Sequence, residues 1–392
     1  MHILILGNDP KSLVNFRGPL IEAMLSAGHR VSAAGAGRDA KADAWLAARG
    51  VCYHDVPMAR AGLNPLTDGR TLARLVRLMR KVKPDLLFAY TIKPVVYGLI
   101  AARMAGVPRR TAMISGLGYA FTENPGEALP ARMKRSAVHA AARAAYGLAL
   151  RYADTVIFQN PDDRDAFARM GLTHARQHVG LVNGSGVDID HYRPASMPDG
   201  PTTFLMIARL LRDKGVYEYV EAARIVKREH PTARFWLIGP FDPNPAAVKP
   251  AEVDAWVREG VIDYGGATDD VRPYIAGCHV FVLPSFYGEG IPRTILEAMA
   301  MGRPIITTDM PGCREAVVDG ETGLVVIARS GSELGRAMLD ACNHRASFAS
   351  LGQNSRQRAV RLFSARSVAA STLQALVPGT ELELDGSYAI AS

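Results

Sequence analysis

Short apolar runs alternate with helical patterns along almost the whole chain, and this alternation constrains the fold more than any other feature. In the first half the apolar runs are His2–Leu6, Arg30–Ala34, Cys52–Asp55, Asp85–Tyr90, Thr111–Ser115, Thr155–Phe158 and His178–Val182. The helical stretches between them include Phe16–Ala27, Thr71–Val82 and Val95–Ala105. Strands that alternate with helices predict a parallel sheet with helices on both faces.

The alternation is interrupted over Asn183–Pro198, which is rich in Gly, Pro and Asp and is typical of a linker. A second series follows, with apolar runs at Thr203–Ala208, Phe235–Gly239, Val261–Tyr264, Val280–Pro284, Pro304–Thr307 and Gly323–Val326. A chain of 392 residues is long enough for two domains. We therefore predict two doubly wound α/β domains, 1–185 and 199–362, which face a central cleft where ligands bind.

Composition excludes several classes of protein. Hydrophobic residues make up 48% and charged residues 21%, as in ordinary globular domains. The four cysteines, at positions 52, 278, 313 and 342, form no CxxC pair, which argues against a disulfide framework or a zinc site. The first apolar run is too short for a signal peptide, and no run reaches the roughly 18 residues of a membrane span. We expect a cytoplasmic protein that is soluble or at most peripheral.

The formal net charge of +8 suits either plain solubility or attraction to phosphates in a nucleic acid, a nucleotide or an anionic lipid surface. Aromatic residues make up only 7%, and the chain carries no recognisable nucleic-acid-binding motif. We therefore do not expect a nucleic acid among its partners.

The most informative segment is 283–297, LPSFYGEGIPRTILE. A strand ends at its start, a glycine-containing polar loop follows, and Pro292 suits the beginning of a helix because its missing N–H is not needed there. The N–H groups at a helix N-terminus favour a phosphate. Glu289 can reach a sugar at the mouth of this helix, and Glu297 can accept hydrogen bonds from a ribose diol. Taken alone, two glutamates eight positions apart would also fit a solvated strand, loop and helix.

A second basic segment, IARLLRDKGV at 207–216, follows another strand. Arg209 and Lys214 would lie at the carboxyl end of that strand and could clamp a diphosphate, the arginine through two parallel hydrogen bonds and the lysine as a point charge. An isolated arginine and lysine would fit a solvated basic loop equally well.

Taken together, these motifs resemble glycosyltransferase family 4, whose members have two Rossmann-like domains in the GT-B arrangement. The resemblance covers nearly the whole chain and is strongest over Arg209–Gly215 and Pro284–Gly323. It implies a retaining hexosyltransferase, and it implies that a C-terminal helix near 364–377 packs back on the first domain.

The resemblance also implies the donor site. Arg209 and Lys214 would hold the diphosphate of a nucleotide-sugar, Glu289 would contact the sugar hydroxyls, and Glu297 would bind the ribose. The implied catalytic residues are Glu289, Arg209 and Lys214, and the implied donor contacts are Arg209, Lys214, Gly290, Ile291, Pro292, Thr294 and Glu297.

In the first half, the runs FAYTIKPVVYGLIAARMAGVP and ISGLGYAF resemble a subgroup that extends saccharides carried on polyprenyl diphosphate in bacterial polysaccharide or glycan assembly. The implied acceptor contacts are Arg17, Lys93, Ser115 and Gly116. Lys93 is the candidate for the lipid diphosphate, and Arg17, at the expected start of a helix, fits either a phosphate contact or a surface charge. Many family members carry a histidine where this chain has Ile114-Ser115-Gly116, so Ser115 is the candidate to replace it.

The segment 130–153 combines Arg132, Lys134, Arg135, Arg143 and Arg151 with the apolar residues Met133, Val138, Ala142, Tyr146 and Leu150. A basic amphipathic helix of this kind could lie on an anionic leaflet, such as the inner face of the plasma membrane. It could equally be a surface helix packed on its own sheet.

The family transfers sugars with retention. A double displacement would need a second carboxylate near the anomeric carbon, which the sequence does not clearly supply, so we favour a front-face path. The chain has no DxD-like pair, because Asp269 and Asp270 are adjacent and outside the motifs, and cationic side chains can replace a metal. We therefore predict metal-independent transfer, with no other cofactor.

The sequence leaves the donor open. A UDP-hexose or UDP-N-acetylhexosamine is favoured, and GDP-mannose is the alternative. A GT-B nucleotide-sugar epimerase and a non-catalytic nucleotide-sugar-binding protein are less favoured alternatives. A dehydrogenase would need GxGxxG after the first strand, where this chain has GNDPKS.

Overall fold

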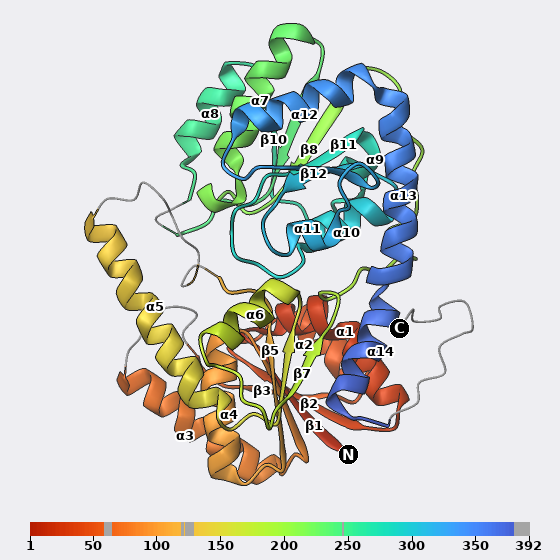
Figure 1. Ribbon diagram of the computed structural model, residues 1–392. Coiled ribbons are helices and arrows are strands. Elements are labelled where there is room, and N and C mark those ends of the chain that lie inside the picture. The colour runs from red at the N-terminus through yellow and green to blue at the C-terminus, as the bar shows by residue number, and fades with distance from the viewer. Residues whose placement is uncertain (59–64, 119–120, 122–128, 245–246, 380–392) are drawn as a thin grey trace. The chain divides into compact units, whose positions relative to one another are not determined.

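The structure is a computed structural model that describes residues 1–58, 65–118, 121, 129–244 and 247–379, and the chain forms two compact units (Figure 1). Unit 1 contains Met1–Gly186 and the chain from Ala365 onward, and unit 2 is Val187–Ser364. The first division falls inside the predicted linker Asn183–Pro198, and the chain returns to unit 1 at the start of its last described helix.

Unit 1 is built on a parallel sheet of order β3-β2-β1-β4-β5-β6-β7 in the described part of the chain. The strands are β1 (His2–Leu6), β2 (Arg30–Gly35), β3 (Cys52–Asp55), β4 (Leu86–Tyr90), β5 (Arg109–Ile114), β6 (Thr155–Phe158) and β7 (His178–Leu181). The helices are α1 (Pro10–Ser26), α2 (Ala40–Ala47), α3 (Pro65–Val82), α4 (Ile92–Ala105), α5 (Leu129–Leu150), α6 (Pro161–Arg169) and α14 (Ala365–Leu376).

Helices cover both faces of this sheet, and strand β1 shows why both faces must be apolar. Leu4 and Leu6 pack into the core beneath α3, α4, α5 and α6, whereas Ile3 and Ile5 pack into the core beneath α1, α2 and α14. Successive strand residues point to opposite faces, so a strand buried on both sides reads as one continuous apolar run. Figure 1 shows α14 beside α1, with α3, α4 and α5 grouped at the other side of the sheet.

Unit 2 repeats this plan with the parallel order β10-β9-β8-β11-β12-β13. The strands are β8 (Thr203–Ile207), β9 (Arg234–Ile238), β10 (Asp263–Gly266), β11 (Val280–Leu283), β12 (Ile305–Thr308) and β13 (Gly323–Val326). The helices are α7 (Val216–Glu229), α8 (Pro250–Arg258), α9 (Arg272–Gly277), α10 (Arg293–Ala300), α11 (Cys313–Ala316), α12 (Gly331–Asn343) and α13 (Arg345–Phe363), with a 3₁₀ turn at Arg212–Lys214.

The predicted α/β class with two doubly wound domains is confirmed, and the strand predictions differ from the observed strands by two residues at most. The start of α1 was predicted wrongly. The helix begins at Pro10 instead of near Phe16, because Asp9 caps it by accepting a hydrogen bond from the Ser12 N–H and Pro10 fits the first helical position. Arg17 therefore lies inside the helix and not at its start.

The chain that enters unit 2 is fixed to it by two arginines, one buried and one half-buried. Arg303 is fully buried and donates to the carbonyl oxygens of Ile275, Ala276 and Ser196. Arg356 donates to the carbonyl oxygens of Ile189, Tyr192 and Ala300. These bonds satisfy carbonyls at the ends of α9 and α10 that have no partner within their helices, and they hold the segment 187–198 against unit 2.

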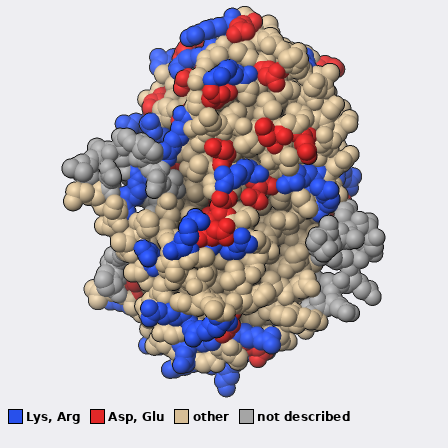
Figure 2. Space-filling model, in the orientation of Figure 1, with Lys and Arg blue, Asp and Glu red and all other residues tan. Residues whose placement is uncertain are grey.

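Charges are mixed on the face shown in Figure 2. Blue and red side chains are interspersed over unit 2, and blue prevails at the lower end of unit 1. Among the described residues, no helix has the length and apolar character that crossing a bilayer requires.

Candidate functional site

The neighbouring strands β8 and β11 mark the point in unit 2 where the order of the sheet reverses. The chain turns from β8 toward β9 and β10, and β11 then pairs with the other edge of β8. In an open parallel sheet, the loops that follow two such strands lie side by side and form the usual ligand site. Here they are the segments 208–215 and 284–292, the same two that the sequence singled out.

Two glycines allow other segments of the backbone to pack closely against the loop after β11. A Cβ on Gly215 would lie 2.1 Å from the carbonyl oxygen of Pro284, and a Cβ on Gly312 would lie 2.0 Å from the carbonyl oxygen of Gly290. Both glycines have φ near +80°, which other residues adopt only with strain. The amide of Phe286 also donates to the carbonyl of Asp213 at 2.9 Å. The loop is therefore fixed by backbone contacts with the segment that carries Lys214.

Lys214 and Glu289 meet within this arrangement, although they are far apart in the sequence. Their Nζ and Oε1 atoms are 2.5 Å apart, and their side chains are 11% and 19% exposed. The hydroxyl of Ser285 donates to the same Oε1 at 3.0 Å. The lysine also lies 5.3 Å from the centre of the Tyr287 ring. A cation, a carboxylate and a hydroxyl thus lie together near the start of α10, a combination suited to a phosphate and sugar hydroxyls.

Arg209, by contrast, is not part of this cluster in the structure. Its side chain is 52% exposed and pairs with Asp242 at 2.8 Å, on the loop after β9. Asp242 is also fixed by the amide of Asn244, which donates to its other oxygen. An exposed pair of this kind is weak, so the guanidinium can exchange the carboxylate for an anionic ligand at small cost.

Glu297 lies in the middle of α10 and is buried. Its Oε1 accepts a hydrogen bond from Arg293 Nε at 3.0 Å, and Tyr192 forms a second hydrogen bond with the carboxyl group. Burial raises the pKa of Glu297 above its ordinary value, and the charge of Arg293 and the bond from Tyr192 oppose that rise. The other predicted donor contacts lie before α10 or in its first turn: Gly290, Ile291 and Pro292 are buried, and Thr294 is half-buried.

Cys313 lies at the start of α11 and is excluded as a nucleophile. It is fully buried, and burial raises the pKa of its thiol to about 12. A protonated, inaccessible thiol packs as a small apolar group.

The structure changes the interpretation of Arg17. The residue is buried inside α1, where its guanidinium lies over the Tyr90 ring at 4.7 Å and donates to the Ser185 hydroxyl at 3.1 Å. Burial lowers the pKa of Arg17. The alternative of a plain surface charge is therefore wrong, and so is the position at the start of a helix, whereas contact of Arg17 with a phosphate stays a prediction.

Lys93 lies in the first turn of α4 and is also buried. Its Nζ is 3.2 Å from Asp68 on α3, and Tyr97 bonds to the same aspartate. The lysine charge is thus compensated within unit 1. Ser115 and Gly116 follow directly after β5, and Gly116 has φ of +112°. The structure does not bring Ser115 into a described contact with Lys93.

Sequence reasoning missed Asp242, Ser285, Asp68 and Tyr192. Ser285 lies inside the motif PSFYGEG and could have been found from its position four residues before Glu289. The other three lie on different elements from their partners, so no local sequence pattern indicates them.

Comparisons with known proteins extend these findings. Residues 17–180 match the family model described as "Glycosyl transferase 4-like domain", and residues 201–344 match "Glycosyl transferases group 1". The N,N'-diacetylbacillosaminyl-diphospho-undecaprenol alpha-1,3-N-acetylgalactosaminyltransferase of Campylobacter jejuni is 28% identical over 289 residues, which are 70% of this chain and 72% of that protein. The UDP-Gal:alpha-D-GlcNAc-diphosphoundecaprenol alpha-1,3-galactosyltransferase of Escherichia coli is 24% identical, over 66% of each chain.

Solved structures share the whole fold. Anabaena Alr3699/HepE, solved in complex with UDP, superposes with a TM-score of 0.73 at 19% identity and covers 96% of this chain and 99% of its own. Sucrose-phosphate synthase from Thermosynechococcus elongatus gives a TM-score of 0.76 at 20% identity, over 95% of this chain and 98% of its own. With both family models matched in chain order and two doubly wound units, the chain belongs to the glycosyltransferases of the family 4 type and has the GT-B fold.

Proposed function

We propose that the protein transfers a hexose or N-acetylhexosamine from a UDP-sugar, with retention, to a saccharide carried on polyprenyl diphosphate. The observation that carries this proposal is the cluster of Lys214, Glu289 and Ser285 beside the start of α10. It joins a cation for a diphosphate to acceptors and donors for sugar hydroxyls. The Campylobacter and Escherichia relatives, whose names include diphospho-undecaprenol acceptors and in one case UDP-Gal, support the choice of substrates.

The donor would bind with its diphosphate against the start of α10 and its ribose at Glu297. Lys214 would exchange Glu289 for a phosphate oxygen, and Arg209 would leave Asp242 to join it. Backbone N–H groups at Gly290 and Ile291 would add hydrogen bonds to the donor. Glu289, released from the lysine, would accept hydrogen bonds from the sugar.

In the front-face path, the bond between the anomeric carbon and the diphosphate oxygen breaks while the acceptor hydroxyl approaches from the same side. The acceptor oxygen forms the new glycosidic bond, and its proton passes to the departing diphosphate. Lys214, Arg209 and the start of α10 would stabilise the negative charge on that leaving group. No carboxylate nucleophile is needed, which agrees with the sequence, where no second carboxylate is clearly placed near the anomeric carbon.

The transfer assay tests the function as a whole. We expect the purified protein to move sugar from a UDP-hexose or UDP-N-acetylhexosamine to a polyprenyl-diphosphate saccharide, measured by mass spectrometry of the lipid product. Transfer from GDP-mannose alone would favour the mannosyltransferase alternative. An epimerised donor without acceptor would indicate an epimerase, and nucleotide binding without any product would indicate a non-catalytic protein.

The ion pair gives a second prediction. Lys214→Met should lower kcat by roughly 10²–10³, because a positioned charge on the leaving group is lost. The double variant Lys214→Met/Glu289→Gln should be as slow as Lys214→Met. Removing the unpaired carboxylate does not restore the lost positive charge. The control is Arg224→Met on α7, which breaks an exposed pair at 2.7 Å with Glu259, the residue that follows α8, and should leave kcat unchanged. Recovery of activity in the double variant would mean that the pair only stabilises the fold.

Metal independence is a third prediction. Arg209 and Lys214 supply the positive charge that a divalent ion supplies in other nucleotide-sugar enzymes, so transfer should continue in excess EDTA at an unchanged rate. The measurement is the initial rate with and without EDTA. An absolute requirement for Mn²⁺ would overturn this assignment of the two cations.

We also propose that α5 contacts an anionic membrane surface. Of its predicted apolar residues, Ala142, Tyr146 and Leu150 are buried against unit 1. Met133 and Leu148 remain 65% and 50% exposed, and with Arg151 they lie on one side of the helix at 3.6 residues per turn. The side chains of Arg132 and Lys134 lie outside the described residues.

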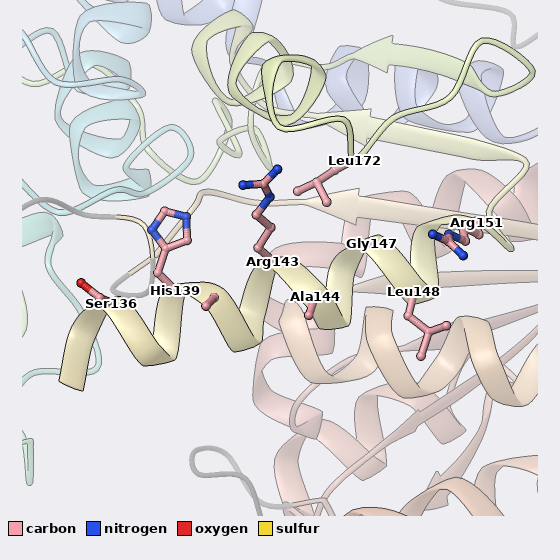
Figure 3. A pocket seen from close by; sticks show the side chains of 9 residues that line it. Ser136, His139, Arg143, Ala144, Gly147, Leu148, Arg151 and Leu172 are labelled. Atoms are coloured by element: carbon pink, nitrogen blue, oxygen red, sulfur yellow. The ribbon is translucent and has the colours of Figure 1, made fainter. Parts of the chain in front are cut away.

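A groove of about 580 Å³ runs along this helix, lined by Ser136, His139, Arg143, Arg151 and Leu172 among others (Figure 3). Figure 3 shows His139 and Arg143 projecting from the same side of α5 toward the segment that carries Leu172. Basic groups beside exposed apolar residues are suited to lipid phosphates and the acyl boundary beneath them.

Vesicle binding tests this contact. Arg151→Glu should weaken binding to vesicles containing phosphatidylglycerol by roughly tenfold or more, because a positive charge near the surface becomes negative. Vesicles of phosphatidylcholine alone should bind neither form well. The control is Arg258→Glu on α8, which should bind as the unaltered protein does, and equal binding by both variants would contradict the proposal.

A further inference from the structure

Tyr192 lies on the segment that leads from unit 1 into unit 2, and its hydroxyl bonds to a residue far away in the sequence. The side chain is buried and forms a hydrogen bond with the carboxyl group of Glu297 on α10. Burial raises the pKa of Tyr192, so the hydroxyl keeps its proton and donates it to the carboxylate.

The tyrosine is fixed relative to α10 by a second contact. Arg356 Nη1 donates to the carbonyl oxygen of Tyr192 at 3.1 Å and to that of Ala300, the last residue of α10, at 2.8 Å. One guanidinium therefore joins the backbone of the tyrosine to the helix that carries Glu297. This arrangement fixes the direction from which the tyrosine hydroxyl approaches the carboxylate.

Glu297 has a second partner on its own helix. Arg293 Nε bonds to one carboxylate oxygen at 3.0 Å. The two donors approach from different elements, which restricts rotation of the carboxyl group and leaves its remaining lone pairs aimed in fixed directions. A ribose diol requires such fixed acceptors, because both of its hydroxyls must bond at once.

We propose that Tyr192 is a positioning residue for the nucleotide donor, acting by orienting Glu297 toward the ribose. The inference rests on the proposed function, in which Glu297 receives the ribose hydroxyls. It adds a residue from the connecting segment that none of the donor motifs contains. Tyr192 itself touches no reacting atom, so its removal affects donor binding and leaves the chemical step intact.

The charged groups around the pair determine the pH dependence. Arg293 and Tyr192 favour the ionised form of Glu297, whereas burial opposes it and raises its pKa. Beside Tyr192 lie Arg272 and Asp270, which form an ion pair with each other at 2.8 Å. His191 lies against the Tyr192 ring, with ring centres 5.0 Å apart.

The direction of the pH effect follows from these groups. Affinity for a donor that binds the ionised carboxylate is highest at pH values above the pKa of Glu297. It falls as the pH decreases below that pKa. Without the tyrosine hydroxyl, the ionised form loses one stabilising bond, so the pKa of Glu297 rises further. The loss of affinity on acidification should therefore begin at a higher pH.

The experiment is calorimetric titration of the full chain with UDP and, separately, with GDP, over a range of pH. Tyr192→Phe should weaken binding of the preferred nucleotide about tenfold. It should also move the acidic loss of affinity to higher pH and raise the donor KM, while kcat at saturating donor stays within about twofold. Adding Glu297→Gln to Tyr192→Phe should cost no more than Glu297→Gln alone, because the tyrosine acts only through the carboxylate.

Tyr217→Phe is the matched control. It removes another tyrosine–glutamate bond, from Tyr217 to Glu252 at 2.9 Å, on α7 and α8. This variant should change melting temperature without changing the pH profile of nucleotide binding. The inference is overturned if Tyr192→Phe binds nucleotide as the unaltered protein does, or if both variants weaken binding equally. Failure of the unaltered protein to bind either nucleotide would instead contradict the proposed function and, with it, this inference.

Discussion

Every strand pair in the two sheets is parallel, and a parallel pair cannot be closed by a tight turn. Each strand must return over a face of the sheet, so helices cover both faces and all carboxyl ends of the strands meet at one edge. In unit 2 this edge brings the loop after β8 against the loop after β11. The contact is close enough that Gly215 has no room for a side chain, and Gly312, on the segment after β12, packs as closely against the loop after β11. The approach of Lys214 to Glu289 is a consequence of this backbone packing.

The candidate cations are thus compensated by carboxylates within each unit separately. Lys214 is paired with Glu289, Arg209 with Asp242, Arg293 with Glu297 and, in unit 1, Lys93 with Asp68. Partly buried cations are stable there only because each has a carboxylate nearby. In the proposed donor complex, a diphosphate would take the place of Glu289 at Lys214 and of Asp242 at Arg209.

The fold was predictable because its signal is local. A strand buried on both faces must be apolar throughout, which made β1 visible with both bounds correct at His2–Leu6. The helix start at Asp9-Pro10 was also a local signal, and overlooking it misplaced Arg17. Partners of the site residues were not predictable, because Asp68, Asp242 and Tyr192 approach through tertiary structure. The same applies to α5, whose periodicity shows an apolar face but not that Tyr146 and Leu150 pack on the unit's own core.

Unit 1 is discontinuous along the chain, and this has a consequence for its synthesis. Helix α14 contributes Ala369, Leu373 and Leu376 to the core beneath α1 and α2, yet it follows the whole of unit 2 in sequence. A ribosome working at roughly 5–20 residues per second needs on the order of ten seconds or more to make the intervening residues. During that interval the face of the first sheet that α1 and α2 cover lacks the part of its cover that α14 supplies, while unit 2 can fold without interruption. The nascent chain therefore passes through a state in which its first-made domain is the last to be completed.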